Sequence, residues 1–484
     1  MNGAQRRKFG RRNGANEVKI RVIGGGLAGP EAALTAARFG CDVDLYEMRA
    51  MVEGKPRLTP AHQTIEFGEL VCSNSLKSES PNTAPWLLKQ EMRRAGSALL
   101  KIADETAVPA GHALAVDRVE FSKRIAEAIE REPGIRVVRE EVTRLDEPAN
   151  LAAGGYAATI VATGPLTSDA LSAEIRRITG SKHLSFYDSI SPIVDAESID
   201  MERVYFAARY DKGGADYINC PMNREEYDRF YDALVAAEPA ESKAWESCDY
   251  FEGCLPIEET ARRGRDTLRY GPMKPKGLRD PRTGREPWAV VQLRKENVRA
   301  DSYNLVGFQN HLKFGEQARV LRLIPGLENA KFLRYGQIHR NTYICAPALL
   351  DELLRLKSEP RILFAGQISG VEGYTESIAT GMLAGIYAAA LADGREVTAV
   401  PRGTALGSLV HYITHADMKD FQPANITFDL LVPLEEEVRR KVRDKKERHR
   451  MVCERALAEF DGWWSSSHIS EAKRGVIIGA ESEQ

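Results

Sequence analysis

The sequence predicts an α/β fold in which the parts of one parallel sheet are not contiguous along the chain. Three segments, at 18–47, 159–168 and 361–392, each contain a short apolar run that ends in glycine, as buried strands of a parallel sheet do. This rhythm is lost between 205 and 335, where aromatic and charged residues interleave. We therefore expect a discontinuous sheet domain with a smaller α+β insertion domain.

The first segment has the order strand, glycine turn, helix, strand. The run Val18–Ile23 is short and β-branched, and the alanine-rich stretch that follows the turn predicts a helix closed by Gly40. Asp42–Tyr46 predicts a second strand, which ends at Glu47. This order is the βαβ start of a dinucleotide-binding domain.

The glycine turn itself satisfies the spacing G-x-G-x-x-G. Gly24 permits the tight turn, Gly26 lets the backbone approach a pyrophosphate, and Gly29 lets the helix pack closely on the strand. The carboxylate of Glu47 is placed to accept hydrogen bonds from a ribose, and it disfavours the 2′-phosphate of NADP as the resident nucleotide. The candidate pyrophosphate-binding residues are Gly24, Gly25, Gly26, Leu27, Ala28 and Gly29.

The other two segments indicate which dinucleotide is bound. The second ends in Thr163 and Gly164, and the third runs from Ile362–Ala365 through a glycine-rich turn into a helix of small residues. Three such units in one chain resemble flavoproteins of the glutathione-reductase type, which favours FAD over NAD. Further candidate FAD-binding residues are Thr163, Gly164, Gly366, Gln367, Gly373 and Tyr374.

The composition indicates the cellular environment in which the protein works. The 484 residues carry 67 Lys and Arg against 69 Asp and Glu, so the net charge of −2 says nothing about nucleic acid. The seven cysteines form no C-x-x-C pair, which is typical of reduced thiols in a cytosol and predicts no metal site. No apolar run approaches the ~20 residues of a membrane span, and the N-terminus lacks the apolar stretch of a signal peptide. We expect a cytoplasmic protein without a membrane segment.

The insertion is locally basic although the whole chain is not. Residues 261–300 hold twelve Lys and Arg but only four Asp and Glu. Lysine and arginine neutralise phosphates, and the interleaved aromatics can stack on unpaired bases, so the insertion is a candidate RNA-facing surface. A solvated basic face is the alternative. The candidate RNA-binding residues are Arg262, Arg263, Lys274 and Lys276.

The expected domain organisation follows from these patterns. Residues 1–16 form a basic, disordered arm, 17–204 the first part of the FAD-binding domain, and 205–335 the insertion. Residues 336–484 return to the FAD-binding domain and add charged C-terminal helices, among them the basic run 439–450. The sequence leaves open whether the protein is a monomer or a dimer.

Two cysteines stand apart from the others, for which a buried, inert position is expected. Cys72 and Cys254 both follow acidic and apolar residues and precede turn-forming residues, so either could be exposed. A thiolate is a soft nucleophile suited to addition at C6 of a uracil, and the nearby Arg262 and Arg263 would favour a thiolate at Cys254. The spacing alone does not decide between a reactive and an inert cysteine.

Longer strings resemble one known family, the folate- and FAD-dependent tRNA (uracil-5-)-methyltransferases, from Val18 to about Arg450. They include VIGGGLAGPEAA, ELVCSNSLKS, VPAGHALAVDR, ATGPLTS, FEGCLPIEE, GPMKPKGL, YGQIHRNTYI, LFAGQISGVEGY and HYIT. The N-terminal arm and the tail after Arg450 have no counterpart in this resemblance.

The resemblance implies a reaction. Such enzymes transfer a methylene unit from 5,10-methylenetetrahydrofolate to C5 of the T-loop uridine of tRNA, reduce it to a methyl group with FADH2, and restore the flavin with NAD(P)H. By the match to FEGC, Cys254 is the nucleophile, and by the match to VCSNS, Cys72 lies beside the flavin. His339 in the HRNT string, together with Tyr374, is expected to hold the folate.

Several other functions remain open at this point. A plain FAD oxidoreductase explains the glycine units but leaves the basic insertion unused. An S-adenosylmethionine-dependent methyltransferase gives no role to the third glycine unit. A related flavoprotein that modifies the wobble uridine of tRNA or methylates ribosomal RNA, and a flavin-carrying RNA-binding protein without activity, also share parts of the pattern.

Overall fold

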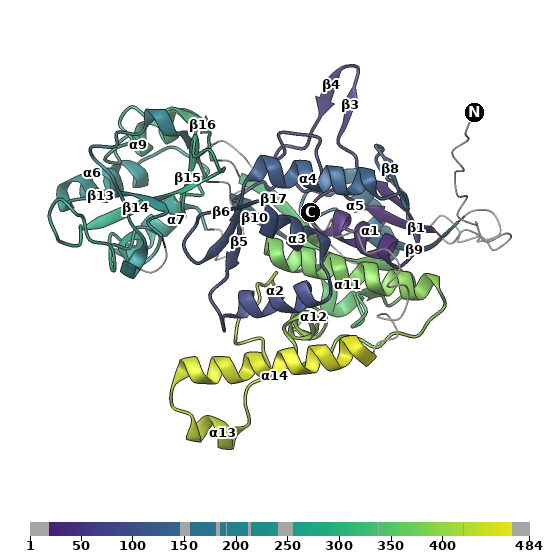
Figure 1. Cartoon of the computed structure of the whole chain (residues 1–484). Coiled ribbons are helices and arrows are strands. Elements are labelled where there is room, and N and C mark those ends of the chain that lie inside the picture. Colours follow the sequence, from purple (N-terminus) through teal and green to yellow (C-terminus); the bar gives the residue numbers. More distant parts are fainter. Residues whose placement is uncertain are drawn as a thin grey trace, which may run out of the picture.

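The computed structural model describes residues 19–145, 155–180, 184–189, 191–211, 214–240, 255–336, 338–419 and 421–466. Only the backbone is described for 184–189, 211 and 338–341. The N-terminal arm predicted at 1–16 lies outside these residues. The chain forms two lobes, a larger one that contains both ends of the described sequence and a smaller one inserted into it (Figure 1).

The larger lobe is built on the predicted parallel sheet. Its strand order is β18-β19-β9-β1-β2-β8, and all neighbours are parallel except the edge pair β18–β19. The strands are β1 (Lys19–Ile23), β2 (Asp42–Tyr46), β8 (Ile135–Val138), β9 (Tyr156–Val161), β18 (Arg355–Leu356) and β19 (Glu359–Phe364). The three predicted strand–glycine units thus supply the neighbouring strands β1, β9 and β19, which confirms the predicted fold class.

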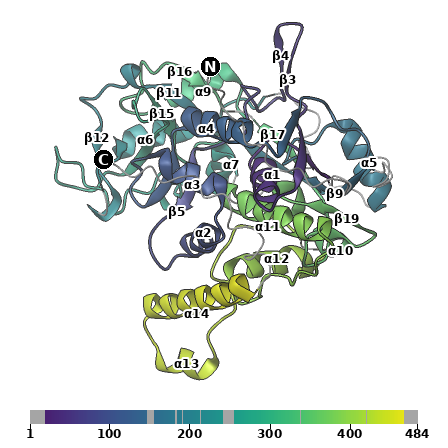
Figure 2. The same cartoon turned by 45° about the vertical axis from the view of Figure 1, so that its right-hand side comes forward.

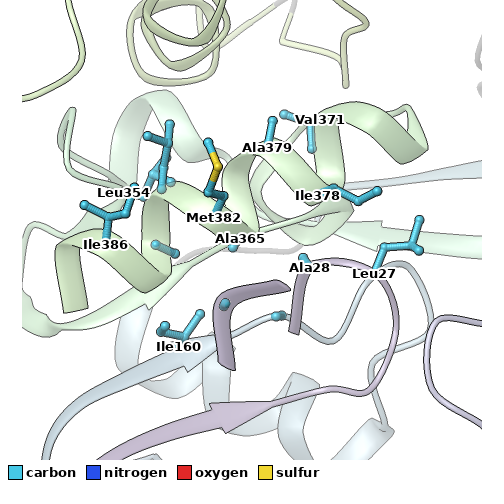
Figure 3. Close-up of a cluster of buried hydrophobic side chains, with 14 of the residues drawn as sticks. Leu27, Ala28, Ile160, Leu354, Ala365, Val371, Ile378, Ala379, Met382 and Ile386 are labelled. Carbon is cyan, nitrogen blue, oxygen red and sulfur yellow. The ribbon is translucent and has the colours of Figure 1, made fainter. Parts of the chain in front are cut away.

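Two helices pack together against this sheet at small residues. A Cβ atom added at Gly381 of α11 (Tyr374–Ala392) would overlap the backbone of Ala28 in α1 (Ala28–Arg38), and one added at Gly385 would lie 2.6 Å from the carbonyl oxygen of Ala32. Figure 3 shows this contact, with Met382 and Ile386 among the buried side chains of α11. The small residues of α11 are explained by this close approach, since larger side chains would separate the helices.

Further elements surround this core. The remaining helices of the larger lobe are α2 (Ala84–Arg94), α3 (Ala98–Glu105), α4 (Arg118–Arg131), α5 (Asp169–Thr179), α10 (Ala346–Leu349), α12 (Ala405–His415), α13 (Glu436–Lys441) and α14 (Lys445–Ser466). A short sheet joins β5 (Ser75–Ser78), β7 (Ala113–Val116) and β6 (Ala107–Val108), and the hairpin β3 (Ala50–Val52) and β4 (Lys55–Arg57) projects from the lobe (Figure 1). The basic run 439–450 is divided between α13 and α14 rather than forming a single helix.

A buried carboxyl group connects α2 to α12. Glu91 is fully buried and accepts hydrogen bonds from the backbone N–H groups of Ala405 (2.7 Å) and Leu406 (2.8 Å) at the start of α12. Burial raises the pKa of Glu91 to about 8, although these two N–H groups favour the charged form. The carboxyl group is therefore largely protonated at neutral pH.

The smaller lobe has its own sheet and its own core. Its strand order is β12-β13-β14-β15-β11-β16, and every pair is antiparallel. The strands are β11 (Ile193–Asp195), β12 (Tyr205–Phe206), β13 (Tyr217–Met222), β14 (Ala289–Lys295), β15 (Ser302–Leu305) and β16 (Phe332–Arg334). Its helices are α6 (Arg224–Val235), α7 (Ile257–Arg262), α8 (Thr267–Tyr270) and α9 (Phe314–Leu321), with short 3₁₀ turns η2 (Ala196–Ser198) and η3 (Arg209–Asp211).

The two lobes are joined by a pair of strands. β10 (Leu184–Ser189) leaves the larger lobe and β17 (Ile338–Tyr343) returns to it, and the two pair antiparallel. The sheet of the smaller lobe extends beyond the predicted range 205–335, because β11 lies between β15 and β16 in that sheet. In the described parts of the chain, no helix is both long and apolar enough to cross a membrane.

Candidate active site

The glycine turn after β1 has the geometry that its spacing predicts. Gly24 has φ +115°, and a Cβ atom added there would overlap the carbonyl oxygen of Ala162. A Cβ atom at Gly29 would overlap the carbonyl oxygen of Gly24, whereas one at Gly26 would meet nothing within 4 Å. Gly24 and Gly29 are therefore required for packing, while Gly26 leaves open space in front of the first turn of α1. That open space is the cradle that a pyrophosphate needs.

One cavity brings the three glycine units together. The carboxyl ends of β1, β9 and β19 meet at the same edge of the parallel sheet, and the residues that follow each strand face one another there. Of the residues predicted from the sequence, those lining the cavity are Gly24, Gly25, Gly26, Leu27, Ala28, Glu47, Thr163, Gly164, Gly366, Gln367 and Tyr374. Gln367 begins the 3₁₀ turn η5 (Gln367–Ser369).

Two predicted glycines have structural roles beside this cavity. Gly29 is at the contact of α1 with its own turn. Gly373 precedes α11, and a Cβ atom there would overlap the carboxylate of Glu376, which pairs with Lys77 at 3.0 Å. Both glycines shape the backbone around the cavity without lining it.

Glu47 lines the cavity and is held by its own neighbours. Its carboxylate accepts hydrogen bonds from the backbone N–H of Gly25 and from the backbone N–H and Nε of Arg49 at 2.8 and 3.0 Å. Burial raises the pKa of Glu47, but the charge and hydrogen bonds of Arg49 outweigh burial, and the pKa lies below its usual value. Glu47 is therefore a fixed anion at the place where the sequence predicts a ribose contact.

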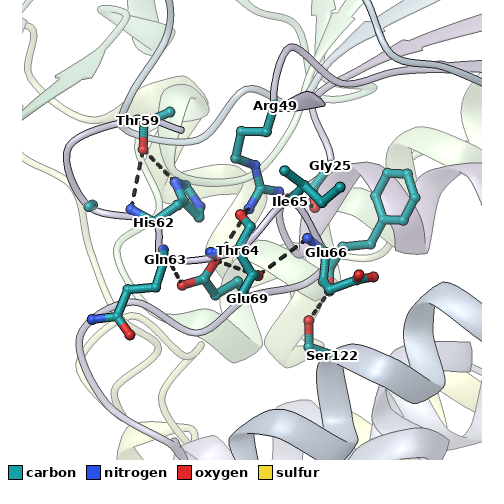
Figure 4. A network of polar contacts seen from close by, with 12 residues as sticks. Gly25, Arg49, Thr59, His62, Gln63, Thr64, Ile65, Glu66, Glu69 and Ser122 are labelled. Atoms are coloured by element: carbon teal, nitrogen blue, oxygen red, sulfur yellow. Dashed lines mark hydrogen bonds and ion pairs between the residues drawn. The ribbon is translucent and has the colours of Figure 1, made fainter. Parts of the chain in front are cut away.

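Arg49 also takes part in a wider polar network that includes Thr64 and Glu69 (Figure 4). The guanidinium is buried, pairs with Glu69 at 3.5 Å, and donates a hydrogen bond to the backbone carbonyl of Thr64 at 3.3 Å. Glu69 in turn accepts hydrogen bonds from the backbone N–H groups of Gln63 and Thr64. This network ties the segment that follows the β3–β4 hairpin to the glycine turn.

Cys72 lies beside the cavity, against Tyr374. The Tyr374 hydroxyl oxygen is 2.8 Å from the backbone nitrogen and 2.9 Å from Sγ of Cys72. Burial raises the pKa of Tyr374 well above its usual value, and the nearby Cys72 raises it further. Because Tyr374 lines the cavity, the Cys72 sulfur lies beside the cavity.

Two arginines that the sequence analysis did not single out lie near this pair. Arg118, the first residue of α4, pairs with Glu296 at 2.8 Å and donates to the backbone carbonyl of Leu70. Arg334 comes from β16 of the smaller lobe and donates to the carbonyl of Ala61 at 3.0 Å. Burial lowers the pKa of the Arg334 guanidinium, and the positive charge of Arg118 lowers it further.

Both guanidinium groups act electrostatically on Cys72 and Tyr374, so the sulfur lies in a positive field. Arg118 ends the string VPAGHALAVDR, one of the strings that resemble the family, so the sequence contained a signal that could have identified it. Nothing near Arg334 in the sequence indicates its position, because β16 belongs to the other lobe.

The side chains of two predicted site residues, the nucleophile and one folate-binding residue, are not described. Cys254 lies outside the described residues. His339 is on β17, where its backbone pairs with that of Asp188, but its side chain is not described. The C-terminal end of β17 lies next to the cavity. There the backbone N–H of Thr342 donates to the carbonyl of Pro165, a residue that lines the cavity, at 3.0 Å.

The basic residues of the insertion fall into two groups. Arg262, Arg263, Lys274 and Lys276 are all exposed on the smaller lobe, and Arg262 pairs with Glu259. Other basic residues of the same stretch make contacts inside the protein. Arg294 is buried and its Nε donates to Asn74 of the larger lobe at 2.9 Å, and Arg269 lies over the ring of Trp288. The excess of positive charge in the sequence therefore overstates the exposed positive surface.

Comparisons with known proteins identify the family of this chain. The family model described as "Glucose inhibited division protein A" matches residues 19–396. A relative from Koribacter versatilis, named methylenetetrahydrofolate--tRNA-(uracil-5-)-methyltransferase TrmFO, is 69% identical over 93% of this chain and 99% of its own. A relative of the same name from Solibacter usitatus is 62% identical over 91% of this chain and 98% of its own.

Solved structures show the same fold at much lower identity. Aquifex aeolicus GidA in its form II crystal superposes with a TM-score of 0.67 at 18% identity, over 94% of this chain and 75% of that chain. This likeness concerns the fold alone, whereas the curated relatives confirm the resemblance seen in the sequence strings. The chain belongs to the family of glucose inhibited division protein A and, within it, to the methylenetetrahydrofolate--tRNA-(uracil-5-)-methyltransferases named TrmFO.

Proposed function

We propose that this protein methylates C5 of the T-loop uridine of tRNA, with 5,10-methylenetetrahydrofolate as the one-carbon donor and FAD as the redox cofactor. The observation that supports this most directly is the single cavity lined by three glycine units, with Tyr374 in its lining and Cys72 in contact with Tyr374. The names of the relatives supply the donor, the RNA and the position on the base.

The residues of the cavity fit FAD independently of the relatives' names. Gly26 leaves space for a pyrophosphate, and no side chain among the described residues caps the first N–H groups of α1, so these groups are available to phosphate oxygens. Glu47 is fixed at the ribose end, and Gly366 and Gln367 line the cavity from the third unit. Reduced flavin supplies the two electrons that convert a methylene group into a methyl group.

Cys254 is the proposed nucleophile. C5 of uracil is a weak nucleophile until a thiolate adds to C6, which turns the ring into an enolate that can form a carbon–carbon bond at C5. Loss of the C5 proton then expels the donor amine and leaves an exocyclic methylene, and addition of a hydride to this methylene allows the thiolate to leave C6. Cys72 and Tyr374 act at the flavin end, and His339 with Tyr374 holds the folate.

The smaller lobe is proposed to bind the RNA. The target uridine must leave its stack to reach a buried site, which costs a few kcal/mol that contacts to the protein must return. The exposed Arg262, Arg263, Lys274 and Lys276 are suited to phosphate contacts, which position the RNA without reading its sequence. NAD(P)H is the proposed source of electrons, and the cytoplasm is the proposed location.

A nucleoside analysis tests this function. Unmodified tRNA and ribosomal RNA fragments are incubated separately with the protein, methylenetetrahydrofolate, FAD and NADH or NADPH, and the digested nucleosides are analysed by mass spectrometry. We expect 5-methyluridine in tRNA only, at the T-loop position, and none when S-adenosylmethionine replaces the folate. Methylation of the ribosomal RNA fragment alone would contradict the proposed substrate, and flavin oxidation without any methylated nucleoside would favour a plain oxidoreductase.

A further inference from the structure

Two histidines and a glutamate meet at the C-terminal end of α12, on the side of the larger lobe where α12 packs on α10 (Figure 2). His411 and His415 are one helical turn apart, and their rings stack with centroids 4.4 Å apart. Glu352 comes from the turn between α10 and β18, and its Oε1 lies 3.7 Å from Nε2 of His415. One ligand atom from each of the three residues lies within 4.8 Å of the other two.

The hydrogen bonds around His415 decide which ring nitrogen carries a proton. The Thr414 hydroxyl lies 2.7 Å from the carbonyl oxygen of Val410 and 2.9 Å from Nδ1 of His415. A carbonyl can only accept, so the single hydroxyl proton goes to Val410, and Nδ1–H of His415 donates to Thr414. In the neutral ring this leaves the lone pair on Nε2, the atom that faces the Glu352 carboxylate.

Two electron-rich atoms that face each other need a positive charge between them. We propose that His411, His415 and Glu352 bind a divalent transition-metal cation, with Zn²⁺ as the best match. Imidazole nitrogen and carboxylate oxygen are zinc ligands at about 2.0–2.2 Å, and the donation of Nδ1–H to Thr414 is the kind of outer contact that orients a metal-bound histidine. The proposal does not depend on the methylation reaction.

Little movement is needed to complete the site. Ligand atoms around a tetrahedral zinc ion are about 3.4 Å apart at the bond lengths above, so the three side chains need to approach by about 1 Å. The side chains of Glu352 and His415 are about half exposed, which leaves them free to rotate. The fourth position is then taken by water.

The cation would connect two parts of the larger lobe. Glu352 belongs to the turn that leads into β18 and β19, and β19 carries Gly366 of the FAD site at its end. His411 and His415 belong to α12, whose other end is held by Glu91. Binding would therefore stabilise the lobe, since a ligand that binds only the folded state raises its stability. Sequence reasoning missed this site because Glu352 is remote in sequence from the histidines.

Titration calorimetry of the full-length, FAD-loaded protein with ZnCl2 tests the proposal. Because other histidines and the cysteines also bind zinc, the reference is the double variant His411→Ala/His415→Ala, in which a partly buried and an exposed helical residue become alanine and the helix is retained. We expect one site per chain in the wild type that the double variant lacks. Glu352→Gln should abolish the same site, and Thr414→Val should weaken it about 10- to 100-fold. His449→Ala, which changes a histidine on α14, should leave it unchanged.

Two further readouts separate a metal site from a simple ion pair. Zinc should raise the melting temperature of the wild type more than that of the double variant, and X-ray absorption of the one-to-one complex should show two imidazole nitrogens around zinc. Coincident binding isotherms for the wild type and the double variant would overturn the proposal. An unchanged site in Glu352→Gln would overturn the assignment of the glutamate.

Discussion

The hydroxyl oxygen of Tyr374 lies 2.9 Å from the sulfur of Cys72, although 302 residues separate them in the sequence. The same oxygen accepts a hydrogen bond from the backbone N–H of Cys72 at 2.8 Å, so its own proton is available to the sulfur. Because burial keeps Tyr374 neutral, this arrangement persists across the physiological pH range. The sulfur is thereby held at the cavity edge, in the field of Arg118 and Arg334.

The two candidate cysteines should respond differently to substitution. We expect Cys254→Ala to abolish the covalent adduct with RNA that contains 5-fluorouridine, because the thiolate at C6 is then missing. Cys72→Ala should retain adduct formation but change the flavin absorbance, since its sulfur lies beside the cavity. Gel analysis of the denatured protein–RNA complex and visible spectra are the measurements. A trapped adduct in Cys254→Ala would show that the nucleophile is assigned to the wrong residue.

Two glycines of the same turn should separate cofactor binding from folding. In Gly29→Ala the new methyl group overlaps the carbonyl of Gly24, so we expect a loss of about 1–3 kcal/mol of stability. In Gly26→Ala the methyl group meets no protein atom, so stability of the cofactor-free protein should change by less than about 0.5 kcal/mol, while the protein purifies with much less FAD. Thermal unfolding and released flavin are measured on both variants. Equal flavin content in Gly26→Ala and the wild type would contradict a pyrophosphate at this turn.

Charge reversal on the smaller lobe should weaken RNA binding. The triple change Arg262→Glu, Arg263→Glu and Lys274→Glu is expected to lower tRNA affinity and to reduce the slope of log K against log salt by about 0.9 for each phosphate that the protein no longer neutralises. Binding is measured between low and moderate salt by filter retention. Arg131→Glu on α4, at a side chain that is 78% exposed, is the control on the larger lobe. Equal affinity in the triple variant and the wild type would remove these residues from the RNA surface.

Glu91 should make the protein less stable as pH rises. Its folded-state pKa is about 8 against 4.5 for an ordinary glutamate, so the folded state retains a proton that the unfolded chain loses above 4.5. This contribution to stability is present in full below pH 4.5 and is lost progressively as pH approaches 8. We expect the melting temperature of the wild type to fall more between pH 5 and 8 than that of Glu91→Gln, which cannot ionise. Glu437→Gln, at an exposed position, is the control, and parallel profiles for wild type and Glu91→Gln would contradict the prediction.

The amino-acid sequence by itself was sufficient to predict the local features of the fold, such as the glycine turn and the ends of strands. The spacing of Gly24, Gly26 and Gly29 predicts the turn, and the structure confirms it, because the roles of these residues depend on backbone atoms only a few residues away or on the adjacent strand. The strand-ending glycines at 164 and 366 were recognisable for the same reason. Long strings such as ELVCSNSLKS identified the family, which the relatives confirm.

Features that depend on contacts between residues remote in the sequence could be determined only from the tertiary structure. Periodicity and composition do not report which strands become neighbours, so the order β19-β9-β1 that sets the three glycine units side by side, the contact of Tyr374 with Cys72 and the place of β11 in the second sheet emerge only from the packed chain. Arg334 of the smaller lobe lies near the Cys72–Tyr374 pair in the larger lobe. Arg294 is buried and donates a hydrogen bond to Asn74, so it does not contribute to the exposed positive surface. Local sequence sets the conformation of each segment, whereas burial and pairing between remote segments determine which side chains share a site.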